Sequence, residues 1–105
     1  MKRCPQNPII RRSDILSEDP RLADVSSVFN PGATSFHDQI LLLLRVQNRG
    51  RETFLVPATS SDGVKFRIWP DAITIAGLDL PGRRVFHVYD PRVTRVSDDY
   101  YVTLA

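Results

Sequence analysis

Short apolar stretches recur along this chain, and each ends after a few residues at Asn, Asp, Gly or Pro. No stretch shows the longer apolar period of an amphipathic helix. Stretches of this length, with turn signals between them at roughly 8–12-residue spacing, are typical of sandwiches, barrels and propellers. The sequence therefore predicts an all-β fold of antiparallel strands, and 105 residues suffice for one small domain.

Two parts of the chain differ in composition. Residues 1–23 are rich in proline and charge, and we expect an extended N-terminal segment with at most one helical turn at Ser13–Ser17, ended by Pro20. Residues 24–105 carry the strand signals. We expect strands at 25–29, 38–47, 53–58, 64–69, 85–88, 92–96 and 100–104.

Three local signals refine this prediction. Asn30-Pro31-Gly32 is expected to end the first strand, because a residue before proline avoids helical angles and glycine permits a sharp bend. Pro57 lacks an amide donor, which indicates an edge or a bulge. Ser61-Asp62-Gly63 is typical of a structural turn, since Asp can bond back to the backbone.

Composition and charge argue against several classes of function. Hydrophobic residues make up 42% and charged residues 25%, as in a soluble globular domain. The net charge is +2 and the basic residues are scattered, so we expect no nucleic-acid partner. The longest apolar run, Ile40–Leu44, is too short to span a bilayer, so we expect no membrane partner.

Cysteine and histidine usage narrows the setting further. Cys4 is the single cysteine, so no intramolecular disulfide is expected. The N-terminus lacks an apolar signal-peptide core, and we expect a reducing, cytoplasmic location. His37 and His87 lie far apart with no ligand cluster around either, so no metal site and no cofactor are expected.

Three polar residues at strand-to-loop transitions form a candidate site. Asn30 lies in FNPG, Arg45 follows the most apolar stretch, and Asp90 lies in YDPR. An amide and a guanidinium can bind sugar hydroxyls, and a carboxyl can transfer a proton. Each also has a structural interpretation: Asp90 as a turn former, Asn30 bonding within its own turn, and Arg45 capping a sheet edge or pairing with Asp90 or Asp38. These residues alone indicate an all-β domain that binds saccharide.

Five segments, in order, resemble glycoside hydrolase family 130. They are RCPQNPII, VFNPGATSF, LLLLRVQNRGRE, SSDGVKF and VYDPRVTRVSDDYYVTLA, which together cover nearly the whole chain. This family contains β-mannoside phosphorylases and related mannosidases, built as five-bladed β-propellers. The resemblance implies that this chain is a partial propeller, comprising the first one to two blades of antiparallel four-stranded sheets.

The resemblance also implies roles for four residues. Asp90 resembles the family's catalytic acid, which in the phosphorylases protonates the leaving oxygen through the sugar's own 3-hydroxyl. Asn30 and Arg45 resemble residues that bind the mannosyl unit, and Arg92 is grouped with them as a support for the loop. The implied partner is a β-mannoside oligosaccharide, cleaved with inversion by inorganic phosphate as co-substrate or by water.

This chain departs from the family pattern at two positions. Many members carry Gly-x-Glu-Asp-Pro-Arg, whereas Tyr89 stands here before Asp90 and the glycine is absent. Thr59 replaces an arginine that often precedes the SxDG turn. A five-bladed ring at roughly 40–50 residues per blade needs about 200–250 residues, so we expect the chain alone to be inactive.

Two alternatives remain at this point. In the first, the chain is a stand-alone saccharide-binding module that forms a homo-oligomer through open sheet edges. In the second, it is a small β-sandwich with an accidental resemblance, which predicts that Asn30, Arg45 and Asp90 point in unrelated directions.

Overall fold

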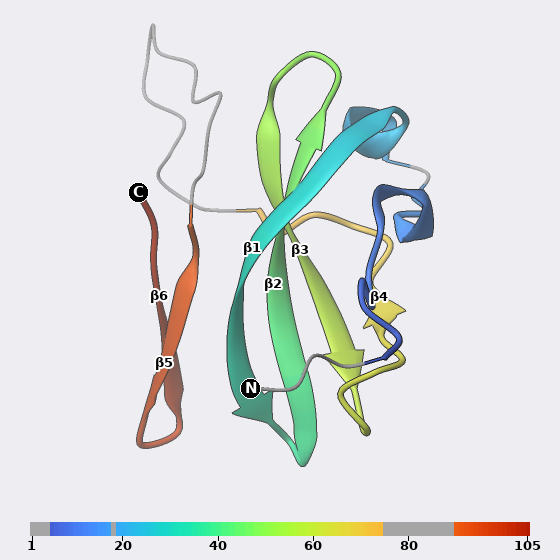
Figure 1. Cartoon of the computed structure of the whole chain (residues 1–105). Helices are drawn as coiled ribbons and strands as arrows, with labels where there is room; N and C mark the ends of the chain where they lie inside the picture. The colour runs from blue at the N-terminus through green and yellow to red at the C-terminus, as the bar shows by residue number, and fades with distance from the viewer. Residues whose placement is uncertain (1–4, 18, 75–89) are drawn as a thin grey trace, which may run out of the picture.

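The computed structural model describes residues 5–17, 19–74 and 90–105, and these residues form antiparallel β-sheets (Figure 1). Four consecutive strands form one sheet in the order β1-β2-β3-β4, and two more form a separate hairpin, β5-β6. The described chain contains two 3₁₀ turns and no α-helix. The elements are η1 (Arg12–Asp14), η2 (Pro20–Leu22), β1 (Val25–Phe36), β2 (Gln39–Asn48), β3 (Thr53–Ser60), β4 (Arg67–Ile68), β5 (Arg92–Val96) and β6 (Asp99–Thr103).

β1 is longer than the sequence suggested, because the expected break at Asn30-Pro31-Gly32 was wrong. The strand passes through these residues with a bulge: Phe29 pairs with Arg45 and Gly32 with Leu43, so β1 has one extra residue there. A bulge accommodates proline, which cannot donate to the ladder, and it redirects neighbouring side chains.

The turn between β1 and β2 is two residues long. His37 and Asp38 both have positive φ, at 46° and 61°. This is the geometry of a type I′ turn, whose twist suits a tight hairpin. Asp38 therefore lies in the turn, and β2 begins one residue later than predicted, at Gln39.

β2 and β3 form the centre of the sheet and are buried on both faces there. Leu44 and Val46 on one face join Val56 and Ala58 of β3 in the main apolar core. On the alternate positions, Leu43 and Leu55 are also buried. The unbroken apolar run in the sequence matches this two-sided burial. Pro57 is buried on β3, which pairs with β2 and β4, so the edge position expected for it was wrong.

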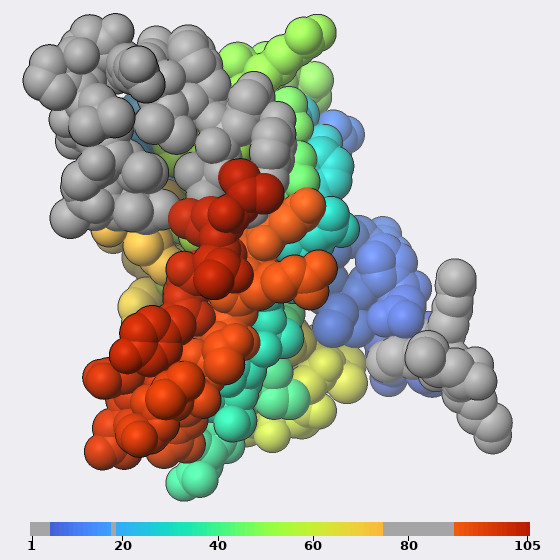
Figure 2. Space-filling model, turned by 90° about the vertical axis from the view of Figure 1, so that its left-hand side faces the viewer, coloured from blue at the N-terminus to red at the C-terminus, as the bar shows by residue number. Residues whose placement is uncertain are grey.

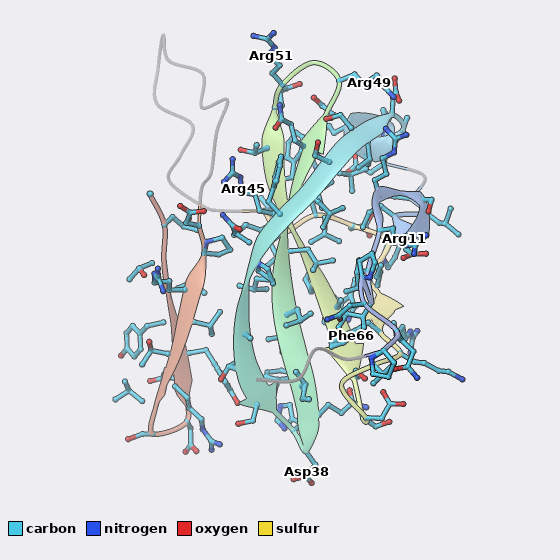
Figure 3. The ribbon with its side chains drawn as sticks, in the orientation of Figure 1. Arg11, Asp38, Arg45, Arg49, Arg51 and Phe66 are labelled. Atoms are coloured by element: carbon cyan, nitrogen blue, oxygen red, sulfur yellow. The ribbon has the colours of Figure 1, made fainter. Side chains whose placement is uncertain are left out.

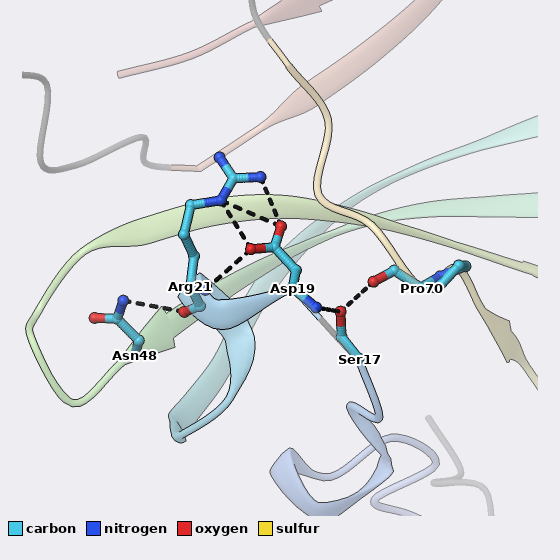
Figure 4. A network of polar contacts seen from close by, with 5 residues as sticks. All are labelled: Ser17, Asp19, Arg21, Asn48 and Pro70. Carbon is cyan, nitrogen blue, oxygen red and sulfur yellow. Dashed lines mark hydrogen bonds and ion pairs between the residues drawn. The ribbon is translucent and has the colours of Figure 1, made fainter.

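The N-terminal segment covers one face of the sheet (Figure 1). Ile15 and Leu22 are buried in the main core. Polar contacts fix the segment at two further points (Figure 4): the Ser17 hydroxyl donates to the Pro70 carbonyl, and Asn48 Nδ2 donates to the Arg21 carbonyl at 3.1 Å. An ion pair joins Arg21 to Asp19 at 2.6 Å.

β4 is shorter than predicted. The alternating pattern of residues 64–69 indicated a strand over that whole range, but only Arg67 and Ile68 are in strand conformation. The backbone amides of Val64 and Lys65 instead donate to Asp62 Oδ1, both at 2.9 Å. The SSDG turn therefore takes up the amides that a longer strand would have used, which confirms its structural role.

The β5–β6 hairpin lies beside β1 (Figures 1 and 2). Tyr100 contacts Phe36 with 5.3 Å between ring centroids. Most side chains of the hairpin are exposed, including Val96, Tyr101 and Val102. The strands expected at 92–96 and 100–104 are thus present to within one residue, whereas the strand expected at 85–88 lies outside the described residues.

The described part of the chain contains no helix that is long and apolar enough to cross a membrane. It also contains no group of three or more His, Cys, Asp or Glu side chains placed to bind a metal ion.

Candidate functional site

Asn30, Arg45 and Asp90 come from three different segments and meet at one point. Asn30 lies in the bulge of β1, Arg45 lies on β2 opposite Phe29, and Asp90 lies two residues before β5. The bulge places Asn30 outside the regular alternation of β1. Figure 3 shows Arg45 directed from β2 toward the side on which the β5–β6 hairpin lies.

One carboxylate oxygen accepts both contacts. Asn30 Nδ2 donates to Asp90 Oδ1 at 3.0 Å, and an Arg45 guanidinium nitrogen donates to the same oxygen at 3.2 Å. Arg45 lies 45 positions and Asn30 60 positions from Asp90 in the sequence, so the fold creates these contacts. Asp90 can accept a hydrogen bond from a ligand at its other oxygen, Oδ2, while these two bonds remain.

Arg45 is oriented by the strand beside it. Its side chain is 16% exposed, compared with 51% for Asp90. The guanidinium carbon lies 4.7 Å from the centroid of the Phe29 ring, within the range of a cation–π contact. Because Phe29 is also the ladder partner of Arg45, the sheet register itself places the ring under the charge.

These neighbours stabilise the charged form of Asp90. The Asn30 hydrogen bond lowers the pKa of the Asp90 carboxyl most, and burial opposes it. The charge and hydrogen bond of Arg45 and the charge of Arg92 each lower the pKa by a smaller amount. Hydrogen bonds and positive charge both favour a carboxylate over the neutral acid. Asp90 is therefore ionised at neutral pH in this chain.

A small depression adjoins the carboxylate. It measures about 180 Å³ and is lined by Asn30, Pro31, Asp90, Pro91 and Arg92. Pockets that enclose drug-sized ligands occupy about 300–1,000 Å³. The depression is smaller than such a pocket.

The geometry decides between two of the earlier interpretations. The accidental sandwich predicted that the three residues point in unrelated directions, and their convergence on one carboxylate oxygen contradicts it. Arg45 pairs with Asp90, as one structural interpretation proposed. Asp90 itself has positive φ, 46°. The catalytic and binding roles of the four residues stay predictions.

Sequence reasoning missed three residues that support the site. Phe29 lies against Arg45, and Gly32 allows the backbone at Pro91 to approach β1 closely. Their sequence positions are the signal that could have located them. Phe29 and Gly32 lie within two residues of Asn30 in FNPG, and Pro91 follows Asp90 in YDPR.

The fold defines a class of protein, the all-β proteins built from antiparallel sheets. In this chain a polar depression lies between the bulge of β1 and the residues before β5. Four consecutive antiparallel strands are the unit of a propeller blade. A family profile described as beta-1,4-mannooligosaccharide phosphorylase matches residues 1–105. The chain belongs to this family, glycoside hydrolase family 130.

Two relatives illustrate the likeness. The chain is 30% identical over 98 residues to the 4-O-beta-D-mannosyl-D-glucose phosphorylase of Bacteroides fragilis, covering 89% of this chain and 24% of that protein. It also resembles the crystal structure of a candidate glycoside hydrolase from Parabacteroides distasonis, with a TM-score of 0.73, 23% identity, and coverage of 99% of this chain and 34% of the other. The chain thus spans about a quarter of one relative and a third of the other.

Proposed function

We propose that this chain supplies the catalytic acid and part of the mannose-binding subsite of an enzyme that cleaves β-mannosides with inversion. The observation that carries the proposal is the convergence of Asn30 and Arg45 on Asp90 in a chain of this family. The curated relative is a mannosyl-glucose phosphorylase, which supports phosphorolysis to mannose 1-phosphate over hydrolysis. The remaining blades of a five-bladed ring would complete the pocket.

The ionised state of Asp90 bears on the mechanism. A general acid works best with a pKa near the working pH, whereas Asn30 and Arg45 hold the pKa of Asp90 down. As a carboxylate, Asp90 accepts a hydrogen bond from a sugar hydroxyl. A bound sugar that excludes water and accepts the hydrogen bond of the Asn30 amide would raise this pKa, so that Asp90 takes up a proton from solvent only with substrate in place. Asp90 then donates this proton to the sugar's 3-hydroxyl, which passes its own proton to the leaving oxygen.

Sugar binding can be tested on the chain as it stands. We expect mannose, and not an unrelated polyol, to shift the NMR signals of the Asn30 side-chain amide and the Asp90 carboxyl. Asp90→Asn and Arg45→Lys should weaken this response, because each removes a charge-assisted contact. The matched control is Asp62→Asn, a carboxylate in the SSDG turn, which should respond as the parent does. An equal response to mannose in all four proteins would contradict the assigned site.

Catalysis is tested by restoring the rest of a pocket. We would replace the matching segment of the Bacteroides fragilis phosphorylase with residues 1–105 and measure release of sugar 1-phosphate. In an active chimaera, Asp90→Asn should lower the rate by about 10²–10⁴-fold, the usual contribution of a general acid. The isolated chain should release none. Full activity of the Asp90→Asn chimaera would overturn the assignment of the acid.

One observation favours a second candidate, a self-assembling saccharide-binding module. Apolar side chains are exposed along the β5–β6 hairpin, with Tyr101 56% and Val96 53% exposed, and two-stranded hairpins gain stability from further pairing. Sedimentation equilibrium separates the two candidates. A homogeneous oligomer that binds mannose would favour the module, and a sugar-binding monomer would favour the enzyme segment.

A further inference from the structure

Gly32 and Pro91 form an unusually close backbone contact. A Cβ atom built on Gly32 would lie 2.6 Å from the Pro91 carbonyl oxygen and 3.1 Å from Cγ2 of Val93. Real Cβ atoms do not approach a backbone oxygen this closely, so only glycine fits at this position without displacing the loop. Pro91 is itself buried, and Gly32 is buried beneath it.

This contact adjoins the candidate site on both sides. Gly32 ends the bulge that contains Asn30, and Pro91 follows Asp90 directly. Asp90 has φ of 46°, a conformation that non-glycine residues adopt only where the surroundings fix it. The Pro91 ring restricts both its own φ and the backbone of Asp90 before it.

We infer that the contact between Gly32 and Pro91 positions the Asp90 carboxylate against Asn30 and Arg45. Asn30 and Asp90 are each within two residues of this contact. Moving the Pro91 carbonyl away from β1 by a few tenths of an ångström or more would carry Asp90 with it, and a 3.0 Å hydrogen bond would lengthen. Gly32 and Pro91 are thus positioning residues, since neither has a polar side-chain group that could bind or transfer a proton.

The inference concerns the carboxylate alone and does not depend on catalysis. Among the residues that the structure describes, the groups that face Asp90 are Asn30 from β1, Arg45 from β2 and Arg92 at the start of β5, of which the two arginines are charged. A residue that only stabilises the fold would change the free energy of unfolding and leave the pKa of Asp90 unchanged in the folded chain. A positioning residue changes that pKa.

The experiment is an NMR titration of the Asp90 carboxyl in the 105-residue chain, without substrate. In the parent, the pKa lies below the usual range of an aspartate. In Gly32→Ala, we expect it to rise toward that range, because Asn30 no longer reaches Oδ1. The matched control is Gly50→Ala in the β2–β3 turn, where the new Cβ meets a side-chain atom, Asn48 Oδ1, at 3.2 Å. Its Asp90 should titrate as in the parent.

A second variant keeps the inference testable if Gly32→Ala does not fold. Pro91→Gly adds no atom to the contact and only frees the loop, so we expect a folded chain in which the pKa of Asp90 again rises. A pKa that stays low in folded Gly32→Ala, or in Pro91→Gly, would overturn the inference. An inactive chimaera, together with the expected rise in the pKa of Asp90 in these variants, would count against the proposed function and leave this inference standing.

Discussion

Two aspartates of this chain have a lowered pKa, but for different reasons. Asp62 accepts from the backbone amides of Val64 and Lys65 and from the Ser60 hydroxyl, all at 2.9 Å and all within three residues. Asp90 accepts from two side chains, Asn30 and Arg45, that lie far away in the sequence. One carboxylate serves its own turn, and the other joins three segments.

The difference shows how a structural carboxylate can be told from a candidate functional one. The donors to Asp62 all belong to its own turn, and they fix the path of the chain there. The partners of Asp90 are polar side chains that can also bind hydroxyl groups, and they lie beside a pocket. A lowered pKa by itself does not separate the two cases, whereas the origin of the donors does.

The largest expected effect comes from a core substitution that weakens the sheet, because the low pKa of both aspartates depends on that sheet being folded. Leu44 is 2% exposed and precedes Arg45 on β2. Leu44→Ala should lower the free energy of unfolding by about 2–5 kcal/mol through lost burial and the cavity left behind. Both carboxylates should then titrate near the usual aspartate range in a partly unfolded population. Urea denaturation followed by tryptophan fluorescence measures the loss.

The matched control for that variant lies on the hairpin. Val102 is 42% exposed on β6, and Val102→Ala should change the free energy of unfolding by about 0.5 kcal/mol or less. An equal loss of stability in Val102→Ala and Leu44→Ala would mean that the hairpin belongs to the main core, contrary to the exposure of Val102.

A smaller effect separates the two aspartates by stability. Asp62→Ala should lower the melting temperature by roughly 5 °C, since it removes the acceptor for two backbone amides. Asp90→Asn keeps the side-chain shape and tolerates positive φ, so its melting temperature should stay within about 2 °C of the parent. Differential scanning calorimetry of both variants measures this. The reverse order of melting temperatures would show that Asp90 is the structural carboxylate.

The fold was largely predictable from these local signals. Apolar runs and turn residues located β2, β3, β5 and β6 to within one or two residues, because burial and turn chemistry act over short distances. Two elements were mispredicted. β1 continues through Asn30-Pro31-Gly32 because a bulge absorbs the proline, and β4 is short because Asp62 takes the amides of Val64 and Lys65.

The site was predictable only in part. Asn30, Arg45 and Asp90 stood out as polar residues near strand ends, and a family resemblance grouped them. Their convergence could not be derived from spacing, since it depends on how the hairpin packs beside β1. The support from Phe29 and Gly32 was also hidden, because an aromatic residue and a glycine give the same sequence signal whether or not a guanidinium or a carbonyl lies against them.

Asn30→Asp sharpens the comparison at Asp90 alone. It replaces the strongest stabilising donor with a second carboxylate about 3 Å away. Two carboxyl groups at that distance cannot both ionise freely, so the higher of the two pKa values of the pair should rise above the usual aspartate range. The pKa of Asp62 should not change. Carboxyl NMR signals of both residues, followed through the same titration, give the two results together. An unaltered pKa at Asp90 would show that Asn30 does not govern its ionisation.

The smallest expected effects come from pH and salt. Because folding lowers the pKa of Asp62 and Asp90, both contribute stability above the unfolded pKa of about 4, and this contribution is lost as pH falls through the folded values.

The salt dependence of the pKa distinguishes the two aspartates. At 1 M NaCl the screening length is about 3 Å, so the effect of Arg45 and Arg92 on Asp90 weakens and its pKa should rise part of the way, the Asn30 bond remaining. Asp62, bound by hydrogen bonds alone, should titrate as at low salt. Equal salt responses would mean that charge contributes nothing particular to Asp90, and that Arg45 faces the carboxylate without stabilising it.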